Sequence, residues 1–181
     1  MFPRIDNLIE QWAINYKDIS HDPAMGSKKK RFYRFDSLEQ AIDITSQFTT
    51  FKTPVCGIVT QFDGVSAGRL MELEVIIFAF TKQAVPRSDI KGAELAAVAA
   101  KNYGADILND LWIWLSDQKK EVGTSTTHPN AWLRGLDTDN VSIVSYPVML
   151  NDWWPTMMEM KCSVTRQTCS DVTKYYKVDW K

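Results

Sequence analysis

The sequence predicts an α+β fold, in which helices pack on one face of a mostly antiparallel sheet of four to five strands. Three observations support this prediction. Segments rich in β-branched and aromatic residues occur in pairs, one long alanine-rich segment repeats apolar residues at helical spacing, and the helical segments stand apart from the strand pairs. We therefore expect one long helix behind the sheet.

The composition is that of one globular domain. The chain has 181 residues, of which 45% are hydrophobic and 24% charged, and this is enough apolar material to bury a core. No repeat or linker divides residues 1–181, so we expect a single domain. The formal net charge of −1 leaves no basic field over the whole chain, which argues against general nucleic-acid binding.

The first third of the chain predicts two helices around a short strand. Residues 3–19 repeat apolar side chains at helical spacing, and Pro3 suits a first helical turn. Residues 31–35 have the pattern of a short strand. Ser37 and Gln40 have the spacing of a capping box, so a second helix should begin there.

The middle of the chain predicts a hairpin followed by the long helix. Residues 53–63 and 69–82 are two strand patterns that flank a glycine-containing turn. The second strand becomes wholly apolar toward its end, which is typical of the centre of a sheet. Ser88 or Asp89 should cap a helix that runs to about Leu115, and its alanines favour close packing on the sheet.

The last third of the chain predicts a loop, two strands and an arm. Residues 116–139 are polar and should form a long loop, and long loops in compact domains are often functional. Residues 141–149 and 156–165 should complete the sheet. Residues 168–181 should form a C-terminal arm or a further strand.

No pattern of metal-binding, redox or targeting residues stands out. Cys56, Cys162 and Cys169 match no zinc spacing and indicate a reduced, cytosolic environment. His21 and His128 stand in loop contexts, where a solvated side chain is expected. The N-terminus lacks the apolar core of a signal peptide, and no apolar run approaches the ~20 residues that span a bilayer. The sequence therefore predicts no cofactor, no metal and no membrane partner.

One short pattern is compatible with catalysis. Glu159 and Lys161 stand two apart on a predicted strand, so their side chains point to the same side, and Asp152 precedes them. Metal-dependent nucleases combine carboxylates on Mg²⁺ with a lysine near the attacking water. The alternative is a solvent-facing pair on an amphipathic strand, which arises often by chance. We expect this alternative and predict no catalytic residue.

A basic run precedes the first predicted strand. Its cations, interleaved with Phe32 and Tyr33, are Lys28, Lys29, Lys30, Arg31 and Arg34. Such a segment can bind a nucleic-acid backbone and stack bases, or it can meet an acidic surface on a partner protein. It can also be a solvated loop whose lysines protect a sheet edge from aggregation. The sequence leaves these three interpretations open.

Large aromatic side chains gather in segments with irregular patterns. Trp153 and Trp154 are adjacent at the start of a strand, where neighbours point to opposite faces, so one of them should be exposed in a monomer. Tryptophan is enriched at the centres of protein interfaces. The predicted interface residues are Trp132, Trp153, Trp154, Tyr175, Tyr176 and Trp180. They indicate an assembly in which neighbouring copies cover the long loop and the arm.

The layout of the chain resembles that of a group of virion proteins. The N-terminal helix is followed by "KKRFYRFDSLEQAI", "VCGIVTQ", a long apolar strand, a long helix and a pair of strands around "NDWWPTMMEMKCSV". In these segments and in their order the chain resembles the tail-terminator or tail-completion (neck) proteins of tailed bacteriophages. Within that family it is most similar to the type found in phages and prophages of Bacteroides-like bacteria.

The resemblance implies a structural role and no enzymatic activity. Members of the family have an antiparallel sheet backed by helices and form a ring, usually a hexamer, at the head-proximal end of the tail. The ring docks to the tube and connector proteins, and DNA passes through it without specific binding. The resemblance thus implies a place in the virion tail or neck after assembly in the host cytoplasm. It implies no catalytic, cofactor-binding or metal-binding residues.

Overall fold

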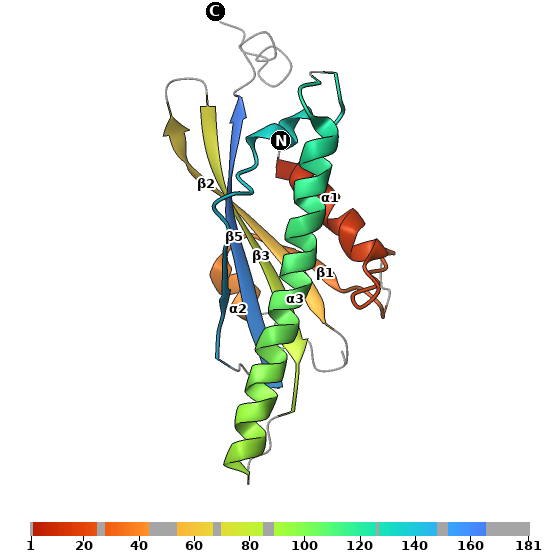
Figure 1. Cartoon of the computed structure of the whole chain (residues 1–181), viewed down its shortest axis with the longest axis vertical. Coiled ribbons are helices and arrows are strands. Elements are labelled where there is room, and N and C mark those ends of the chain that lie inside the picture. Colours follow the sequence, from red (N-terminus) through yellow and green to blue (C-terminus); the bar gives the residue numbers. More distant parts are fainter. Residues whose placement is uncertain are drawn as a thin grey trace, which may run out of the picture.

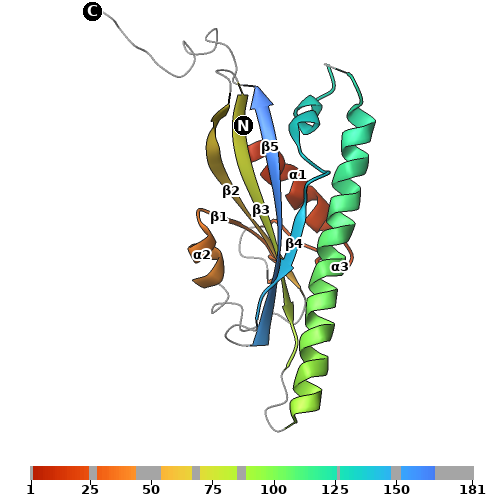
Figure 2. The same ribbon diagram turned by 60° about the vertical axis from the view of Figure 1, so that its left-hand side comes forward.

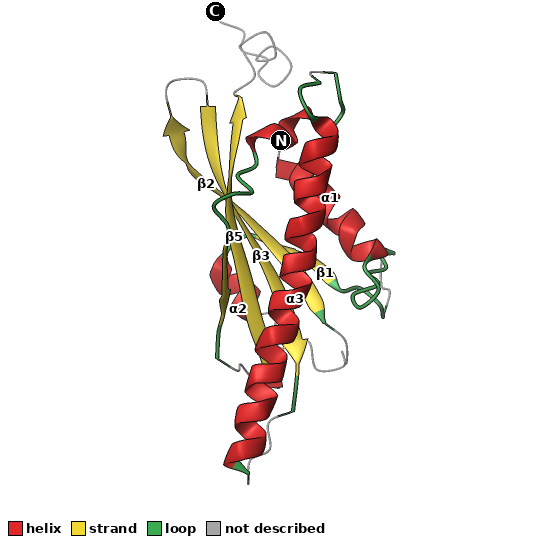
Figure 3. Ribbon diagram, in the orientation of Figure 1, coloured by secondary structure: helices red, strands yellow, loops and turns green. Residues whose placement is uncertain are grey.

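The computed structural model places one five-stranded mixed sheet against a long helix (Figures 1 and 3). The residues that it describes are 2–24, 28–43, 54–66, 70–84, 89–125, 127–147 and 152–165. The predicted α+β class is confirmed, because the strands pair mostly in antiparallel fashion in a single sheet and the long helix packs against that sheet.

The order of α-helices and strands is the predicted one, and the 3₁₀ helix η2, which lies in the predicted loop, is added to it. The helices are α1 (Phe2–Asn15), α2 (Leu38–Asp43), α3 (Ile90–Val122) and the 3₁₀ helix η2 (Ala131–Gly135). The strands are β1 (Phe32–Phe35), β2 (Val55–Ser66), β3 (Leu70–Lys82), β4 (Ser142–Ser145) and β5 (Trp153–Thr165). Ser37 caps α2 as predicted, because its Oγ accepts a hydrogen bond from the Gln40 amide at 3.2 Å.

The strands are arranged in the order β1-β2-β3-β5-β4. β1 runs parallel to β2, and the other neighbouring pairs are antiparallel. The predicted hairpin is formed by β2 and β3, and β3 occupies the centre, where Ile77 lies between Ile58 and Met158. This order leaves β1 and β4 at the two edges of the sheet.

Different helices cover the two faces of the sheet (Figure 2). α1 and α3 lie on one face, where the larger core cluster includes Ile9, Ile77 and Leu111. The short α2 contributes Ala41 to a second cluster, which lies on the opposite face and includes Trp153. α2 therefore departs from the predicted placement of the helices on one face, because it connects β1 to the parallel strand β2 on that far side.

α3 is longer than predicted. It begins after Asp89, whose side chain accepts a hydrogen bond from the Lys91 amide at 3.1 Å. The predicted end at Leu115 is wrong, because the helix continues to Val122 and stops at Gly123, which has a φ of 49°. The first part of the predicted loop 116–139 is therefore helical.

The rest of that loop packs on the sheet. η2 brings the buried side chains of Leu133 and Leu136 onto the larger core cluster. Leu136 forms a β-bridge with Cys162, and the Asp137 amide donates to the Lys161 carbonyl oxygen at 2.7 Å. The loop is thus part of the folded domain. The predicted arm 168–181 lies outside the described residues.

Candidate functional site

The adjacent tryptophans belong to the core. Trp153 and Trp154 have exposed fractions of 0% and 5%. Trp153 lies in the second cluster, with the Lys82 Nζ 5.5 Å from its ring centroid, and the Trp154 indole N–H donates to the Gln83 carbonyl oxygen at 3.2 Å. The expectation that one of them is exposed in a monomer is wrong, because both faces of the sheet are covered where β5 begins.

The other predicted interface aromatics are placed only in part. Trp132 is partly buried and packs from η2 against the larger core cluster. Tyr175, Tyr176 and Trp180 lie outside the described residues. Trp132 alone among the described members of this group therefore keeps a partly exposed ring.

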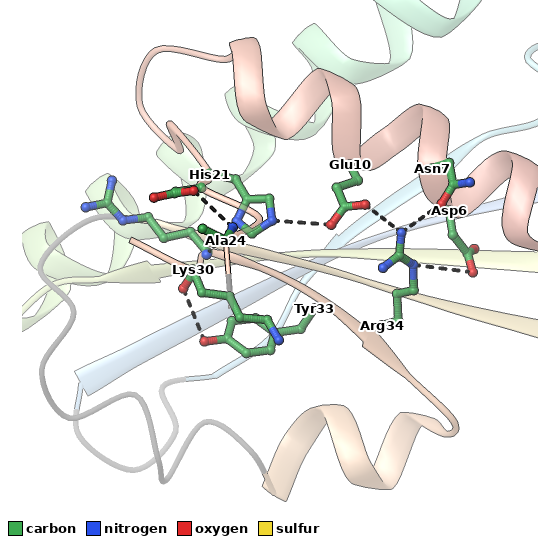
Figure 4. A network of polar contacts seen from close by, with 10 residues as sticks. Asp6, Asn7, Glu10, His21, Ala24, Lys30, Tyr33 and Arg34 are labelled. Carbon is green, nitrogen blue, oxygen red and sulfur yellow. Dashed lines mark hydrogen bonds and ion pairs between the residues drawn. The ribbon is translucent and has the colours of Figure 1, made fainter. Parts of the chain in front are cut away.

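The fold divides the basic run before β1. Arg34 turns toward α1, where its Nη2 donates to Glu10 Oε2 at 2.6 Å and to Asn7 Oδ1 at 2.9 Å (Figure 4). Arg31 donates through Nη1 to the Ile19 carbonyl oxygen at 2.8 Å. These two arginines hold α1 and the loop after it on β1, so they are engaged within the fold.

The remaining cations of the run are the exposed Lys28, Lys29 and Lys30. The Lys30 Nζ lies 5.3 Å from the centroid of the Tyr33 ring, whose face attracts a cation. This basic surface is smaller than the five cations of the sequence suggest. It is compatible with a solvated loop at the edge of the sheet or with a weak anionic partner.

His21 is buried and interacts with both α1 and the start of β1. The expectation of a solvated loop residue is therefore wrong. Its Nδ1 accepts a hydrogen bond from the Arg31 amide at 2.9 Å, and its Nε2 lies 3.4 Å from Glu10 Oε1. Because Nδ1 is an acceptor, the neutral ring carries its proton on Nε2 and donates it to Glu10. Burial lowers the pKa of His21 and the Lys30 charge lowers it further, while Glu10 and Asp22 act in the opposite direction.

We expect acid to weaken these contacts of His21. The folded pKa of His21 is lowered, so below the unfolded value of about 6.5 the unfolded chain binds more protons than the folded one. The free energy of unfolding should then be retained above about pH 6.5 and fall as the pH drops below it. Urea unfolding at about pH 7.5 and pH 5.5 measures this fall. The fall in the free energy of unfolding should be smaller in the His21→Gln variant, whose side chain keeps an acceptor but does not titrate. An equal fall in both proteins would contradict the prediction.

The Glu159–Lys161 pair lies on β5, on the face opposite to α1 and α3. In register, Glu159 is opposite Ser142 of β4, and Lys161 is opposite Glu74 of β3. Asp152 precedes the strand and lies about 23 Å from Glu159 along it, too far to share an ion. Among the described residues, no group of three or more His, Cys, Asp or Glu side chains could hold a metal ion.

The two described cysteines are buried free thiols. Burial raises the pKa of Cys56 well above its ordinary value and that of Cys162 to about 11. Both side chains therefore stay protonated near neutral pH, whereas a nucleophilic cysteine needs its thiolate.

The most unusual described surface is the exposed edge of β4. The sequence predicted a strand here but not its place at the edge of the sheet. Ile143, Val144 and the following Tyr146 are 37%, 43% and 39% exposed. Because neighbours alternate on a strand, apolar side chains are exposed on both faces of this edge. The strand pattern at residues 141–149 indicated a strand, but nothing in it indicated that the strand is the last in the sheet.

A second apolar surface lies at the start of α3, which extends beyond the sheet (Figure 2). Ile90, Leu95 and Val98 are 82%, 70% and 56% exposed, while Ala96 and Ala100 of the same helix are buried. The helix therefore packs through alanines here and directs its larger apolar residues outward. Such a surface is typical of a contact with another chain.

An open groove of about 570 Å³ lies beside the start of β4, between α3 and residues 138–139. Its lining includes Trp112 and Lys119. The Trp112 indole N–H donates to the Thr138 carbonyl oxygen at 2.9 Å, and the Lys119 Nζ donates to the Leu136 carbonyl oxygen at 2.6 Å. These two hydrogen bonds attach residues 136–138 to α3. The polar groups of Trp112 and Lys119 beside the groove therefore have a structural role.

Comparison with known proteins identifies no family. Neither a family model, nor a curated protein, nor a solved structure matches the chain. Among the helices that the structure describes, none combines the length and the apolar composition required to cross a membrane.

Proposed function

We propose that the protein is a structural component of a tailed-bacteriophage virion, which assembles with copies of itself into a ring at the head-proximal end of the tail. The observation that carries self-assembly is the exposed apolar surface of β4. An edge strand with apolar side chains on both faces tends to pair with another chain, and proteins that stay monomeric usually block such edges. The tail or neck assignment rests on the resemblance in layout, with which the α+β fold is compatible.

The two edges of the sheet support a head-to-tail contact. Exposed Lys28, Lys29 and Lys30 precede β1 at one edge, whereas Asp137 and Asp139 precede β4 at the other. Unlike edges favour contacts between different surfaces of two copies, and such contacts close into rings when the rotation permits. A hexamer, docking to tube and connector proteins, and unspecific passage of DNA follow from the resemblance.

Negative-stain imaging of the purified protein tests the proposal. We expect the main species after size exclusion to be rings of uniform diameter with a central opening. Particles no larger than one 20.7 kDa chain at every concentration would contradict self-assembly.

Nucleic-acid binding is the second candidate, and the exposed lysines before β1 favour it. A gel-retention assay with labelled DNA at low salt decides between the two functions. We expect no retention by the wild type or by the variant Lys28→Ala/Lys29→Ala/Lys30→Ala. Retention that the variant loses and that salt reduces would support this candidate instead.

A further inference from the structure

We propose that residues 176–181 of one copy add as an antiparallel strand to the edge of β4 in the next copy. The inference rests on the proposed self-assembly and names the segment and the surface that make the contact. It combines the exposure of β4, the alternating sequence at the end of the chain and the distance between the two.

β4 has an open side on which such a strand can pair. Its residues Ser142–Ser145 pair with β5, and among the described strands none pairs with its other side. The outward N–H and C=O groups of an edge strand need water or another strand as hydrogen-bond partners. Adding a strand to an exposed edge satisfies them in many protein–peptide complexes.

The open side of β4 adjoins a buried apolar cluster. Val144 is opposite Met157 in register, and the Tyr146 hydroxyl donates to the Met157 sulfur at 4.0 Å. Met157 belongs to the second core cluster, together with Trp153. A strand beside β4 would extend this cluster outward if its apolar side chains pointed to the face of Val144 and Tyr146.

Residues 176–181 have the alternating pattern that pairing with the edge of β4 requires. The sequence "YKVDWK" alternates the apolar Tyr176, Val178 and Trp180 with the charged Lys177, Asp179 and Lys181. Strict alternation predicts a strand with one apolar face. In an antiparallel register with Val178 opposite Val144, Tyr176 falls opposite Tyr146, and every apolar residue of the segment points to the Met157 face.

Charge supports the antiparallel direction. The antiparallel direction places Lys181 beside the turn before β4. This turn carries Asp137 and the exposed Asp139. Antiparallel pairs are also slightly more stable than parallel ones. Attraction between exposed charges is weak, so it selects the direction of the strand while the apolar face supplies the affinity.

The reach of the chain favours a second copy as the donor. β5 ends at Thr165, whereas the Tyr146 amide bonds to the Pro155 carbonyl oxygen near the other end of β5 (Figure 2). The two ends lie about 33 Å apart along β5, with about 10 Å more to cross sideways to the outer side of β4. The eleven residue steps from Thr165 to Tyr176 span at most about 40 Å when fully extended. Binding to the same copy would therefore need a nearly extended connection, and a neighbouring copy removes that constraint.

Cysteine pairing tests the contact directly. The register places Ile143→Cys opposite Asp179→Cys, and both changes are made in the full chain with Cys169→Ser to remove a third reactive thiol. Under mild oxidation we expect disulfide-linked dimers and higher multiples on non-reducing gels, and none from either single-cysteine variant. A disulfide that closes within one chain would overturn the second-copy donor. No disulfide in a protein that still forms oligomers would overturn the contact and leave the proposed function standing, whereas a monomeric protein would overturn both.

Exchanging two residues of the segment gives a matched variant. Lys177→Val/Val178→Lys keeps the composition of the full chain but places a lysine between Tyr176 and Trp180 on the apolar face of the segment and moves the valine to the other face. We expect the concentration for half-association to rise about tenfold or more, with the thermal unfolding of the domain unchanged. Val144→Lys should have the same effect from the other side of the contact. Association unchanged in both variants would overturn the inference.

Discussion

Replacing Leu111 by alanine is expected to lower the free energy of unfolding by about 3 kcal/mol. Leu111 is fully buried in the middle of α3 and belongs to the larger core cluster with Ile77 and Met158. The substitution removes buried methyl groups and leaves a cavity between helix and sheet that the neighbours fill only in part. Denaturant unfolding of the two proteins measures the difference.

Ile113→Ala is the matched control on the same helix. Ile113 is 45% exposed, so its loss should change the free energy of unfolding by less than about 0.5 kcal/mol. Equal losses in the two variants would show that α3 does not pack on the sheet through the face described.

Gly135→Ala is expected to lower the free energy of unfolding by about 3 kcal/mol through overpacking. Gly135 ends η2 against the backbone of β5, and an added Cβ would lie 2.8 Å from the Ser163 carbonyl carbon and closer still to its oxygen. Neither backbone can yield easily, because the Asp137 amide is bonded to the Lys161 carbonyl oxygen next to this contact.

Arg134→Ala is the control for this site. Arg134 is exposed, and its side chain donates to the Ala131 and Thr124 carbonyl oxygens. Its loss should cost about 1 kcal/mol. Thermal unfolding followed by circular dichroism compares the two variants, and a Gly135→Ala protein as stable as the wild type would contradict the close docking of η2 on β5.

The sequence was sufficient to predict the elements whose patterns are long and regular. α3 begins where Asp89 indicated, and β2 and β3 form the predicted hairpin. The end of α3 was misplaced because the polar residues after Leu115 suggested a loop, although Gly123 is a typical helix-ending residue. A polar surface is compatible with either a helix or a loop, so the last turns of a helix that leaves the core are hard to predict.

Burial and edge position could not be predicted, because they depend on contacts between distant segments. The alternation of Trp153 and Trp154 was predicted correctly, but the cover over each face is provided by residues far away in the sequence, including Ala41 of α2. His21 is buried for the same reason, since Glu10 and the Arg31 amide enclose it from α1 and from the start of β1. The exposure of β4 follows from its place as the last strand, which no local pattern encodes.

The chain is proposed to assemble with copies of itself through the edge of β4. Light scattering after size exclusion, over a range of concentrations, measures the mass of the full chain and of Val144→Lys. We predict a stable multiple of 20.7 kDa for the wild type, about six copies by the resemblance to ring-forming proteins. For the variant we predict a mass that falls to 20.7 kDa at concentrations where the wild type is still associated. A wild-type mass of 20.7 kDa at every concentration would contradict this self-assembly.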